Sequence, residues 1–357
     1  MSNIALFPVQ KSNAAFARHG KELQNHNVIP ILAPAHITMD GMDLSEIDGG
    51  SNTGIVLRSD LITVLDECEI LYLDCSNFVF KDDDYYRYIE IAKRKDVHIC
   101  YSREIAGRLK INTKQQYDEE IEKTEPDCLI KELIKIEVPI ISVFTMGNEN
   151  DQGNVELEIR KYFISKGYKV SQIGVNEYSR LLGFHVAPPF LFANNIDGKT
   201  KRLLFNRYVR KIIKEEKPDL LIVGVPEAIM KFNDEILSGM GDVPCIVQDA
   251  VESDIGVICT CYEPYTEDYF RELSLYSRYR LNCEARYFNI SNSMIINDPD
   301  NEGRLEHLNL ENSFVMANMD FGLKDDAGFE VFNSFTEASM LKALNKMENE
   351  LLSNPGF

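Results

Sequence analysis

The segment from Val138 to Gly174 constrains the fold more than any other part of the chain. Residues 138–144 form a nearly continuous apolar run, which is typical of a parallel strand covered on both faces. Apolar residues then recur at helical spacing up to Gly167, and residues 168–173 alternate as in a second strand. The helical stripe consists of Val155, Ile159, Tyr162 and Phe163. This order of strand, loop, helix and strand predicts the first βαβ unit of a mononucleotide-binding fold.

The loop between this strand and helix lacks the residues that hold a nucleotide. In a Walker loop, a lysine neutralises phosphate charge and a serine or threonine hydroxyl binds magnesium. Asn154 and Val155 stand at those two positions, and the two glycines are one residue further apart than the motif requires. Glu149 and Asp151 add negative charge where a triphosphate would lie. We therefore expect a structural turn in preference to a nucleotide site, with Asn154 capping the next helix, and we predict no cofactor.

The charge and composition of the chain limit its partners. The formal net charge of -19 at pH 7 disfavours nucleic acid and anionic membrane, and it favours a basic or apolar protein partner. No apolar run approaches the roughly 20 residues of a membrane span, and no leader with a cleavage site opens the sequence, so we expect a cytoplasmic protein. The eight cysteines show no CxxC spacing, which predicts buried thiols and no metal site.

A polar stretch interrupted by Pro126 separates two α/β segments of the chain. Before it, helices alternate with strands expected at 4–9, 28–32, 69–74 and 97–101. We predict two Rossmann-like layered α/β domains with mainly parallel sheets. Their bounds are an N-terminal α/β domain at 1–111, a linker with a connecting helix at 112–137, a C-terminal α/β domain at 138–336, and a C-terminal helix and tail at 337–357.

The second segment continues this alternation. Strands are predicted at 219–225, 245–247, 255–261 and 286–290, and Pro226 is expected to end the first of them. Helices are predicted at 204–213, 267–280 and 337–352. In the last helix, four apolar residues are expected to pack on the body of the protein: Met340, Leu341, Leu344 and Met347.

Polar residues in the loops of the second segment define a candidate crevice. In an open parallel sheet, ligands collect at the carboxyl ends of the strands, near the point where the strand order reverses. The candidate residues expected there are Gly147, Asp151, Gly153, His185, Glu227, Asp249 and Glu263. Such a crevice could include an acid and a base, but any α/β domain places polar groups there, so we assign no catalytic residue. For His185, which lies in an apolar stretch with two prolines, packing is favoured over catalysis.

Four stretches of the second segment carry a resemblance to a known family. They are Gly-Tyr-Lys-Val-Ser-Gln-Ile-Gly at 167–174, Leu-Gly-Phe-His at 182–185, Lys-Pro-Asp-Leu-Leu-Ile-Val-Gly-Val-Pro at 217–226 and Tyr-Phe-Arg-Glu-Leu-Ser at 269–274. The sequence resembles bacterial peptide maturation system proteins, whose genes accompany radical-SAM enzymes in clusters for ribosomally made peptides. The resemblance is best over residues 138–300 and contains no catalytic signature. Glu227 and Ala228 depart from the glycines expected there, and their side chains would narrow any approach of a ligand to the backbone.

The resemblance implies a pathway and leaves two functions open. In the first, the chain is a non-catalytic accessory protein that binds the precursor peptide or a peptide-modifying enzyme, which the missing motifs and the acidic charge favour. In the second, the chain is an enzyme that acts on the peptide or on a small metabolite in the crevice of the second domain. A metabolite or metal bound to the purified protein would favour the enzyme.

Overall fold

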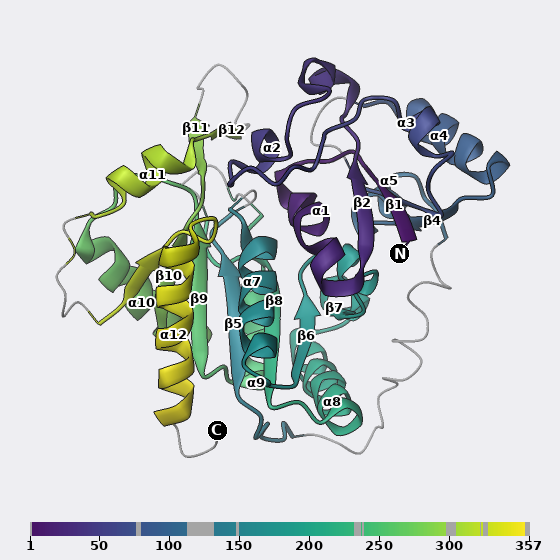
Figure 1. Cartoon of the computed structure of the whole chain (residues 1–357). Helices are drawn as coiled ribbons and strands as arrows, with labels where there is room; N and C mark the ends of the chain where they lie inside the picture. The colour runs from purple at the N-terminus through teal and green to yellow at the C-terminus, as the bar shows by residue number, and fades with distance from the viewer. Residues whose placement is uncertain are drawn as a thin grey trace. The chain divides into compact units, whose positions relative to one another are not determined.

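The computed structural model describes residues 2–75, 80–112, 132–147, 150–231, 237, 239–297, 305–321, 323 and 328–353. The chain forms two compact units (Figure 1). The first comprises Met1–Gln116 and Asn176–Phe184, and the second comprises Tyr117–Val175 and His185–Phe357. The predicted connecting helix falls mostly at 113–131, outside the described residues, and residues 132–139 beside it form no helix.

Four short parallel strands form the sheet of the first unit, in the order β2, β1, β3, β4. The strands are β1 (Ser2–Phe7), β2 (His26–Pro30), β3 (Ile70–Leu73) and β4 (His98–Tyr101). The helices are α1 (Lys11–Gln24), η1 (Pro34–Met39), α2 (Ser45–Asp48), α3 (Leu61–Val64), α4 (Asp82–Arg94), α5 (Arg103–Arg108) and η2 (Glu177–Arg180).

Aromatic packing explains why Asn176–Phe184 belongs to the first unit, although the sequence assigns it to the C-terminal domain. The ring of Tyr178 in η2 stacks on Phe16 of α1, with ring centroids 5.2 Å apart, and it meets Tyr72 of β3 edge-on. All three rings are buried, so their contact contributes a large apolar area to this unit. Local sequence periodicity does not show which sheet such a short segment joins.

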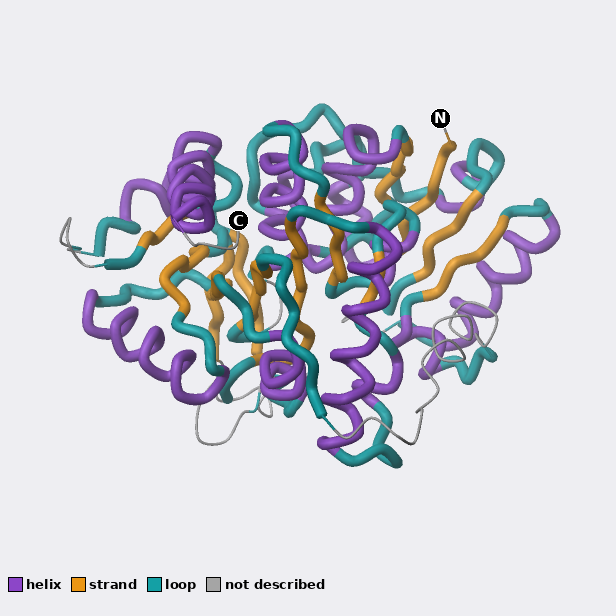
Figure 2. The backbone as a smooth tube through the Cα atoms, turned by 90° about the horizontal axis from the view of Figure 1, so that it is seen from below, coloured by secondary structure: helices purple, strands orange, loops and turns teal. Residues whose placement is uncertain are grey.

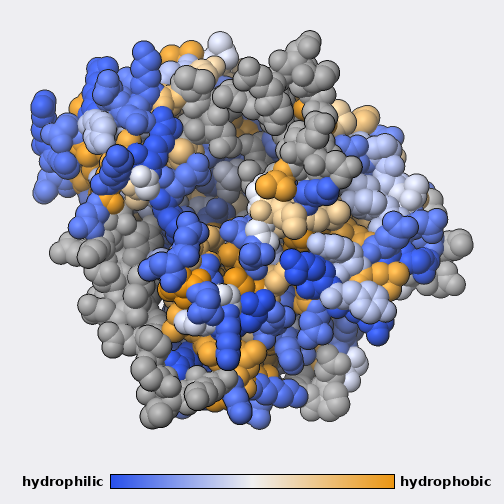
Figure 3. Space-filling model, turned by 180° about the vertical axis from the view of Figure 1, so that it is seen from behind, coloured by the Kyte–Doolittle hydropathy of each residue, from blue (hydrophilic) through white to orange (hydrophobic). Residues whose placement is uncertain are grey.

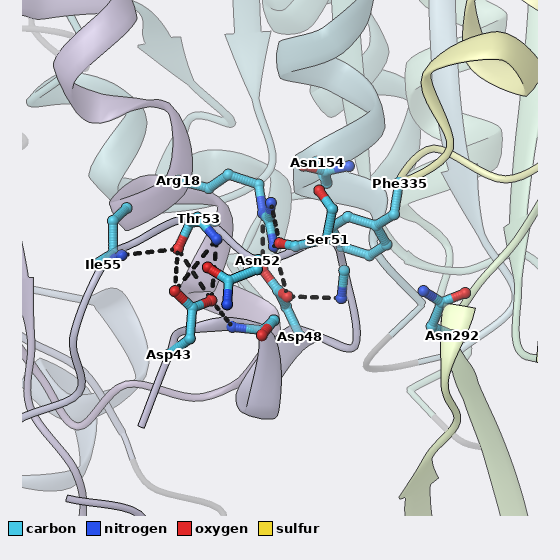
Figure 4. Close-up of polar contacts among 12 residues, drawn as sticks. Arg18, Asp43, Asp48, Ser51, Asn52, Thr53, Ile55, Asn154, Asn292 and Phe335 are labelled. Carbon is cyan, nitrogen blue, oxygen red and sulfur yellow. Dashed lines mark hydrogen bonds and ion pairs between the residues drawn. The ribbon is translucent and has the colours of Figure 1, made fainter. Parts of the chain in front are cut away.

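Two carboxylates hold the loop that follows α2 (Figure 4). Asp43 accepts hydrogen bonds from the backbone nitrogens of Ser45 and Gly54, at 2.9 and 2.7 Å. Burial would raise the pKa of Asp43, but these and other hydrogen bonds outweigh it and hold the pKa below its usual value. Asp48 accepts two hydrogen bonds from the guanidinium of Arg18, at 2.9 and 2.8 Å, so the loop is tied to α1 as well.

Seven parallel strands form the sheet of the second unit, in the order β13, β10, β9, β5, β8, β6, β7. They are β5 (Ile140–Thr145), β6 (Val170–Gly174), β7 (His185–Val186), β8 (Leu220–Ala228), β9 (Ile255–Thr260), β10 (Ala285–Ile290) and β13 (Glu330–Phe332). A separate antiparallel ribbon consists of β11 (Ser293–Asn297) and β12 (Leu305–Asn309). The predicted α/β class with mainly parallel sheets is confirmed.

Helices cover both faces of the seven-stranded sheet (Figures 1 and 2). Two helices, α7 (Gln152–Ser165) and α12 (Glu337–Ser353), share one apolar cluster with the sheet. Three others, α8 (Gly198–Glu216), α9 (Val243–Val251) and α10 (Glu267–Leu281), share the second cluster. The remaining elements are η3 (Pro189–Phe192) and α11 (Asn312–Asn318). Parallel strands joined by such helices need apolar side chains on both faces, which is why β5 reads as one apolar run.

Two predictions about secondary structure are wrong. Residues 245–247 do not form a strand; they lie within α9, which is buried on nearly all sides and so has the composition of a buried strand. Pro226 does not end its strand, because β8 continues to Ala228. The pairing of β8 with β5 shifts register at this point, so the ladder does not need an amide from the proline.

The outer surface of the protein is mixed in character. Hydrophilic residues cover much of the face seen in Figure 3, with smaller apolar areas between them. Exposed apolar residues that stand singly are common on protein surfaces and need no special cause. Among the residues that the structure describes, no helix is long and apolar enough to cross a membrane.

The last helix, α12, carries both buried and exposed apolar residues. Met340, Leu344 and Met347 are buried as predicted, whereas Leu341 is 45% exposed. Ala343 and Leu351 complete the buried stripe, and the sequence interpretation named neither of them. Two leucines of the same helix therefore differ in burial while sharing the same chemistry.

We expect Leu344→Ala to lower the free energy of unfolding by about 2 to 4 kcal/mol, because it leaves a cavity between α12 and the sheet. Leu341→Ala is the matched control and should change stability by less than about 0.5 kcal/mol, since its side chain already contacts water. Urea unfolding of the two variants measures both values. Equal losses would show that α12 packs through a different face.

Candidate functional site

The strand order of the second unit reverses at β5. The chain passes from β5 through α7 to β6 on one side, and α9 later carries it from β8 to β9 on the other side. β8 and β9 therefore flank β5, and the loop after β5 lies where open α/β sheets hold their ligands. Gly147 and Asp151 lie in this loop, and Gly153 lies in the first turn of α7.

The side-chain amide of Asn150 holds this loop in place. Its nitrogen donates hydrogen bonds to the carbonyl oxygens of Gly147 and Cys259, at 3.0 and 2.9 Å, and to the hydroxyl of Thr145. The backbone nitrogen of Met146 also donates to the Cys259 carbonyl, at 3.0 Å. Asn150 is only 3% exposed, so water cannot replace these bonds cheaply. The loop is thus fastened from inside to the ends of β5 and β9.

The first residue of α7 turns its side chain toward the sheet. The amide nitrogen of Gln152 donates to the carbonyl oxygens of Val143 in β5 and Val225 in β8, at 2.8 and 2.9 Å. In nucleotide-binding folds, the corresponding loop and helix start present donors to phosphate. At this position, the side-chain amide of Gln152 donates to the protein's own strands instead.

Asp151 and Asn154 also have partners within the second unit. Asp151 has a left-handed backbone, with φ of 64°, and its carboxylate accepts a hydrogen bond from the backbone nitrogen of Asn292 at 3.3 Å. The sequence predicts Asn154 as the cap of α7, but this is wrong, because the helix begins at Gln152 and Asn154 lies inside its first turn. The Asn154 amide instead donates to the hydroxyl of Ser334, at 3.1 Å.

Three buried asparagines extend this network and are missing from the sequence interpretation. Asn289 donates to the carbonyl of Asn150 at 3.4 Å, and Asn333 donates to the side-chain oxygen of Asn292 at 2.7 Å. Asn289, Asn292 and Asn333 are all fully buried. One signal could have found Asn289, since an asparagine within an apolar strand must obtain hydrogen-bond partners. Their convergence on one loop, however, depends on the order of β10, β9 and β5 in the sheet.

Two further acids lie at the carboxyl ends of neighbouring strands. Glu227 is at the end of β8, and its carboxylate accepts a hydrogen bond from the backbone nitrogen of Val243 at 2.9 Å. Glu263 follows β9, and partial burial raises the pKa of its carboxyl group. In the described part of the chain, no three His, Cys, Asp or Glu side chains are grouped as metal ligands would be.

The other two candidates lie away from this edge. Asp249 belongs to α9, which runs back toward the amino ends of the strands, and its carboxylate pairs with Arg202 of α8 at 2.6 Å. Its placement in the crevice is wrong, because the residues read as a strand before it are helical. His185 in β7 pairs with Glu216 at the end of α8, at 2.6 Å. Glu216 also binds Ser171 near the start of β6, so His185 faces the amino half of that strand.

One buried acid of α7 has no counterpart in the sequence interpretation. Glu156 is 2% exposed and accepts a hydrogen bond from the amide of Gln172 at 3.2 Å. Burial raises the pKa of Glu156 to about 8, and the hydrogen bonds from Gln172 and the Val175 backbone oppose this only in part. Gly224 of β8 makes room for the carboxyl group, since a Cβ there would lie 2.1 Å from its Oε1 atom.

Comparisons with known proteins show the fold of the chain alone. A DUF1611 family protein from Anabaena variabilis matches with a TM-score of 0.61 and 10% identity, over 97% of this chain and 99% of that one. A GTPase from Pyrococcus abyssi matches at 0.32 and 12%, over 61% and 100%. The hydrogenase maturation factor HypB from Archaeoglobus fulgidus matches at 0.32 and 10%, over 65% and 94%. No protein-family model and no curated protein matches the sequence.

Glu156 makes a pH-dependent contribution to stability. Its pKa is about 8 in the folded chain and about 4.5 in the unfolded one, so the folded state binds the proton more tightly. Its contribution is full below about pH 4.5 and is lost as the pH rises to about 8, a change on the order of 4 to 5 kcal/mol.

We expect the unfolding free energy of the wild type, relative to Glu156→Gln, to fall across this pH range. Urea unfolding of both proteins from pH 5 to pH 9 measures the difference, and every other titrating group is common to the two. A difference that stays constant with pH would mean that Glu156 is ionised in the folded protein.

Proposed function

We propose that this protein is a non-catalytic accessory factor in the maturation of a ribosomally made peptide. In this role it binds the precursor peptide or a peptide-modifying enzyme in the cytoplasm. The resemblance of residues 167–174, 182–185, 217–226 and 269–274 to peptide maturation system proteins supports the pathway. The hydrogen bonding of the loop after β5, which is where nucleotide-binding folds hold phosphate, supports the accessory role.

The observation that carries the accessory role is the inward use of polar side chains at the β5 loop. The side-chain amides of Asn150 and Gln152 donate hydrogen bonds to backbone carbonyls of the loop and of β5, β8 and β9. The Asp151 carboxylate adds negative charge at the same loop and accepts a backbone hydrogen bond. A bound triphosphate would have to displace these bonds and approach this charge. The fold therefore serves here as a rigid frame for binding a partner.

The charge of the protein supports a basic partner. Glu227 and Glu263 are partly exposed at the carboxyl edge of the sheet, within a chain of net charge -19. Such a surface attracts a cationic peptide or enzyme during encounter, and salt screens the attraction beyond a Debye length of about 8 Å. The enzyme alternative would use the same edge, with Glu263 as the acid whose pKa burial raises.

We expect no micromolar complex with ATP or GTP in the presence of magnesium, because the β5 loop offers no lysine to the phosphates. Isothermal titration of the purified protein tests this directly. A saturable heat of binding with a micromolar dissociation constant would contradict both the interpretation of the loop and the accessory role.

The partner is identified by coexpressing the tagged protein with the products of its neighbouring genes. We expect a precursor peptide or modifying enzyme to copurify, and its affinity to fall as the salt concentration rises. Glu263→Gln should weaken this binding several-fold, because it removes a charge at the carboxyl edge. Asp249→Asn is the matched control, since it removes the same charge far from the carboxyl edge, near the end of α9 that lies toward the amino ends of the strands. It should leave the affinity unchanged.

Two outcomes would contradict the proposal. Recovery of the tagged protein without any product of the neighbouring genes would show that it binds no partner from this pathway. Loss of product formation in Glu263→Gln, with partner affinity intact, would establish the enzyme alternative.

A further inference from the structure

The β11–β12 ribbon of the second unit offers an open strand edge. Among the described strands, β11 and β12 pair only with each other (Figure 1). The backbone nitrogen of Leu310 donates to Asn292 at 3.0 Å, which places the backbone groups of Asn292 toward β12. The next residue, Ser293, points its carbonyl the other way and accepts a hydrogen bond from the nitrogen of Tyr262 at 2.6 Å.

This register determines the direction of the next backbone groups. In an antiparallel pair, successive residues alternate between facing the partner strand and facing away. The backbone N–H and C=O groups of Met294 and Ile296 therefore face β12, and those of Ile295 point to the open side. Within the described residues, no backbone group pairs with Ile295 on that side. The edge thus has one donor and one acceptor available beyond the bond from Tyr262.

One face of the same ribbon is apolar and partly exposed. Met294 lies opposite Leu308, and Ile296 follows two residues later on the same face. Ile296 is 39% exposed and Leu308 is 45% exposed, whereas Met294 packs partly against the core. The apolar residues therefore run from the core to Ile296, whose partner across the ribbon is Glu306.

Within its described residues, β11 carries none of the side-chain or backbone features that usually prevent strand pairing. Natural edge strands carry a lysine, a proline, a bulge or an inward-pointing charge, and these features prevent another chain from adding to the sheet. The β11 sequence Ser-Met-Ile-Ile-Asn contains no charge and no proline, and its pairing with β12 has no register shift. An edge of this kind invites an extended segment to add as a further strand.

Charge indicates the chemistry of that segment. In the described part of the ribbon, Glu306 pairs with Ile296, and Glu311 follows β12. Glu263 also stands next to Tyr262, whose backbone nitrogen binds the base of the ribbon. A basic segment with apolar residues at alternate positions would complement both the apolar face and this charge.

We propose that β11 binds an extended, basic peptide segment of the partner by β-strand addition along Ile295. The segment forms backbone hydrogen bonds with the outward groups of Ile295, and its apolar side chains lie beside Ile296 and Leu308. This inference rests on the proposed function, because it assigns a docking strand to the same partner.

Ile295→Pro tests the edge directly. The proline removes an N–H that points outward, so the ladder between β11 and β12 loses no hydrogen bond. Ile295→Val is the matched control, since it keeps both the N–H and the strand propensity. A fluorescein-labelled peptide of alternating lysine and valine serves as the probe in fluorescence anisotropy with the full chain. We expect Ile295→Pro to weaken binding at least about tenfold and Ile295→Val to leave it unchanged.

A second variant and two probe controls keep the test independent of the proline. Leu308→Lys leaves the edge intact but places positive charge on the apolar face, and it should also weaken binding of the basic probe. Probes with proline at alternate positions or glutamate in place of lysine should bind weakly. Failure of the wild type to bind the lysine-valine probe, or equal binding by Ile295→Pro, would overturn the docking strand.

Two further measurements separate this inference from its alternatives. Dimerisation of the wild type that Ile295→Pro abolishes, measured by sedimentation, would show a second copy on the edge and overturn the inference. The copurified pathway partner should also be lost in Ile295→Pro and retained in Ile295→Val. If the partner remains bound to Ile295→Pro, the docking strand is wrong and the proposed function stands. If the wild type has no partner, the proposed function itself fails.

Discussion

The second unit depends on one requirement: the polar groups buried at the carboxyl edge of its sheet must be hydrogen-bonded within the protein. A buried amide without partners costs about 1 to 3 kcal/mol, and this edge contains several. Asn150 meets the requirement by joining the ends of β5 and β9, and Gln152 meets it by joining β5 and β8. The loop, the first turn of α7 and three strands are therefore held as one network.

This requirement also bears on function. In a nucleotide-binding protein, the corresponding donors remain available until phosphate arrives, and the helix start contributes its positive end. Here amide side chains bind the strands, while Asp151 supplies an acceptor for Asn292. The side-chain donors at this loop are therefore occupied within the protein. We propose that a partner instead contacts the acids of this edge and the open edge of the ribbon.

Glu156 shows how burial in this unit changes the ionisation of a carboxyl group. Its carboxyl group lies over Gly224, where no other residue would leave space, and burial favours its protonated form. A neutral acid at this position packs as a polar but uncharged side chain. Glu156 can therefore lie between α7 and the sheet without carrying a charge, and the energetic consequence appears as a dependence of stability on pH.

The sequence by itself determined the class of fold and the absence of a Walker lysine. Strand and helix periods arise from local backbone geometry, so an apolar run such as 138–144 and a stripe such as that of α7 can be recognised without the rest of the chain. Local pattern also placed most of the packing face of α12. It failed at residues 245–247, because a short buried helix and a short buried strand have the same composition, and Asp249 was misplaced as a result.

Only the tertiary structure decided which residues meet. The strand order brings Asn289 to the loop after β5 and Asn333 to Asn292, although these partners are far apart in the sequence. Packing of Tyr178 on Phe16 assigned a nine-residue segment, Asn176–Phe184, to the first unit. The open edge at Ile295 follows from register, which a one-residue shift would reverse. Each of these depends on long-range pairing, and a single sequence contains no local signal that specifies it.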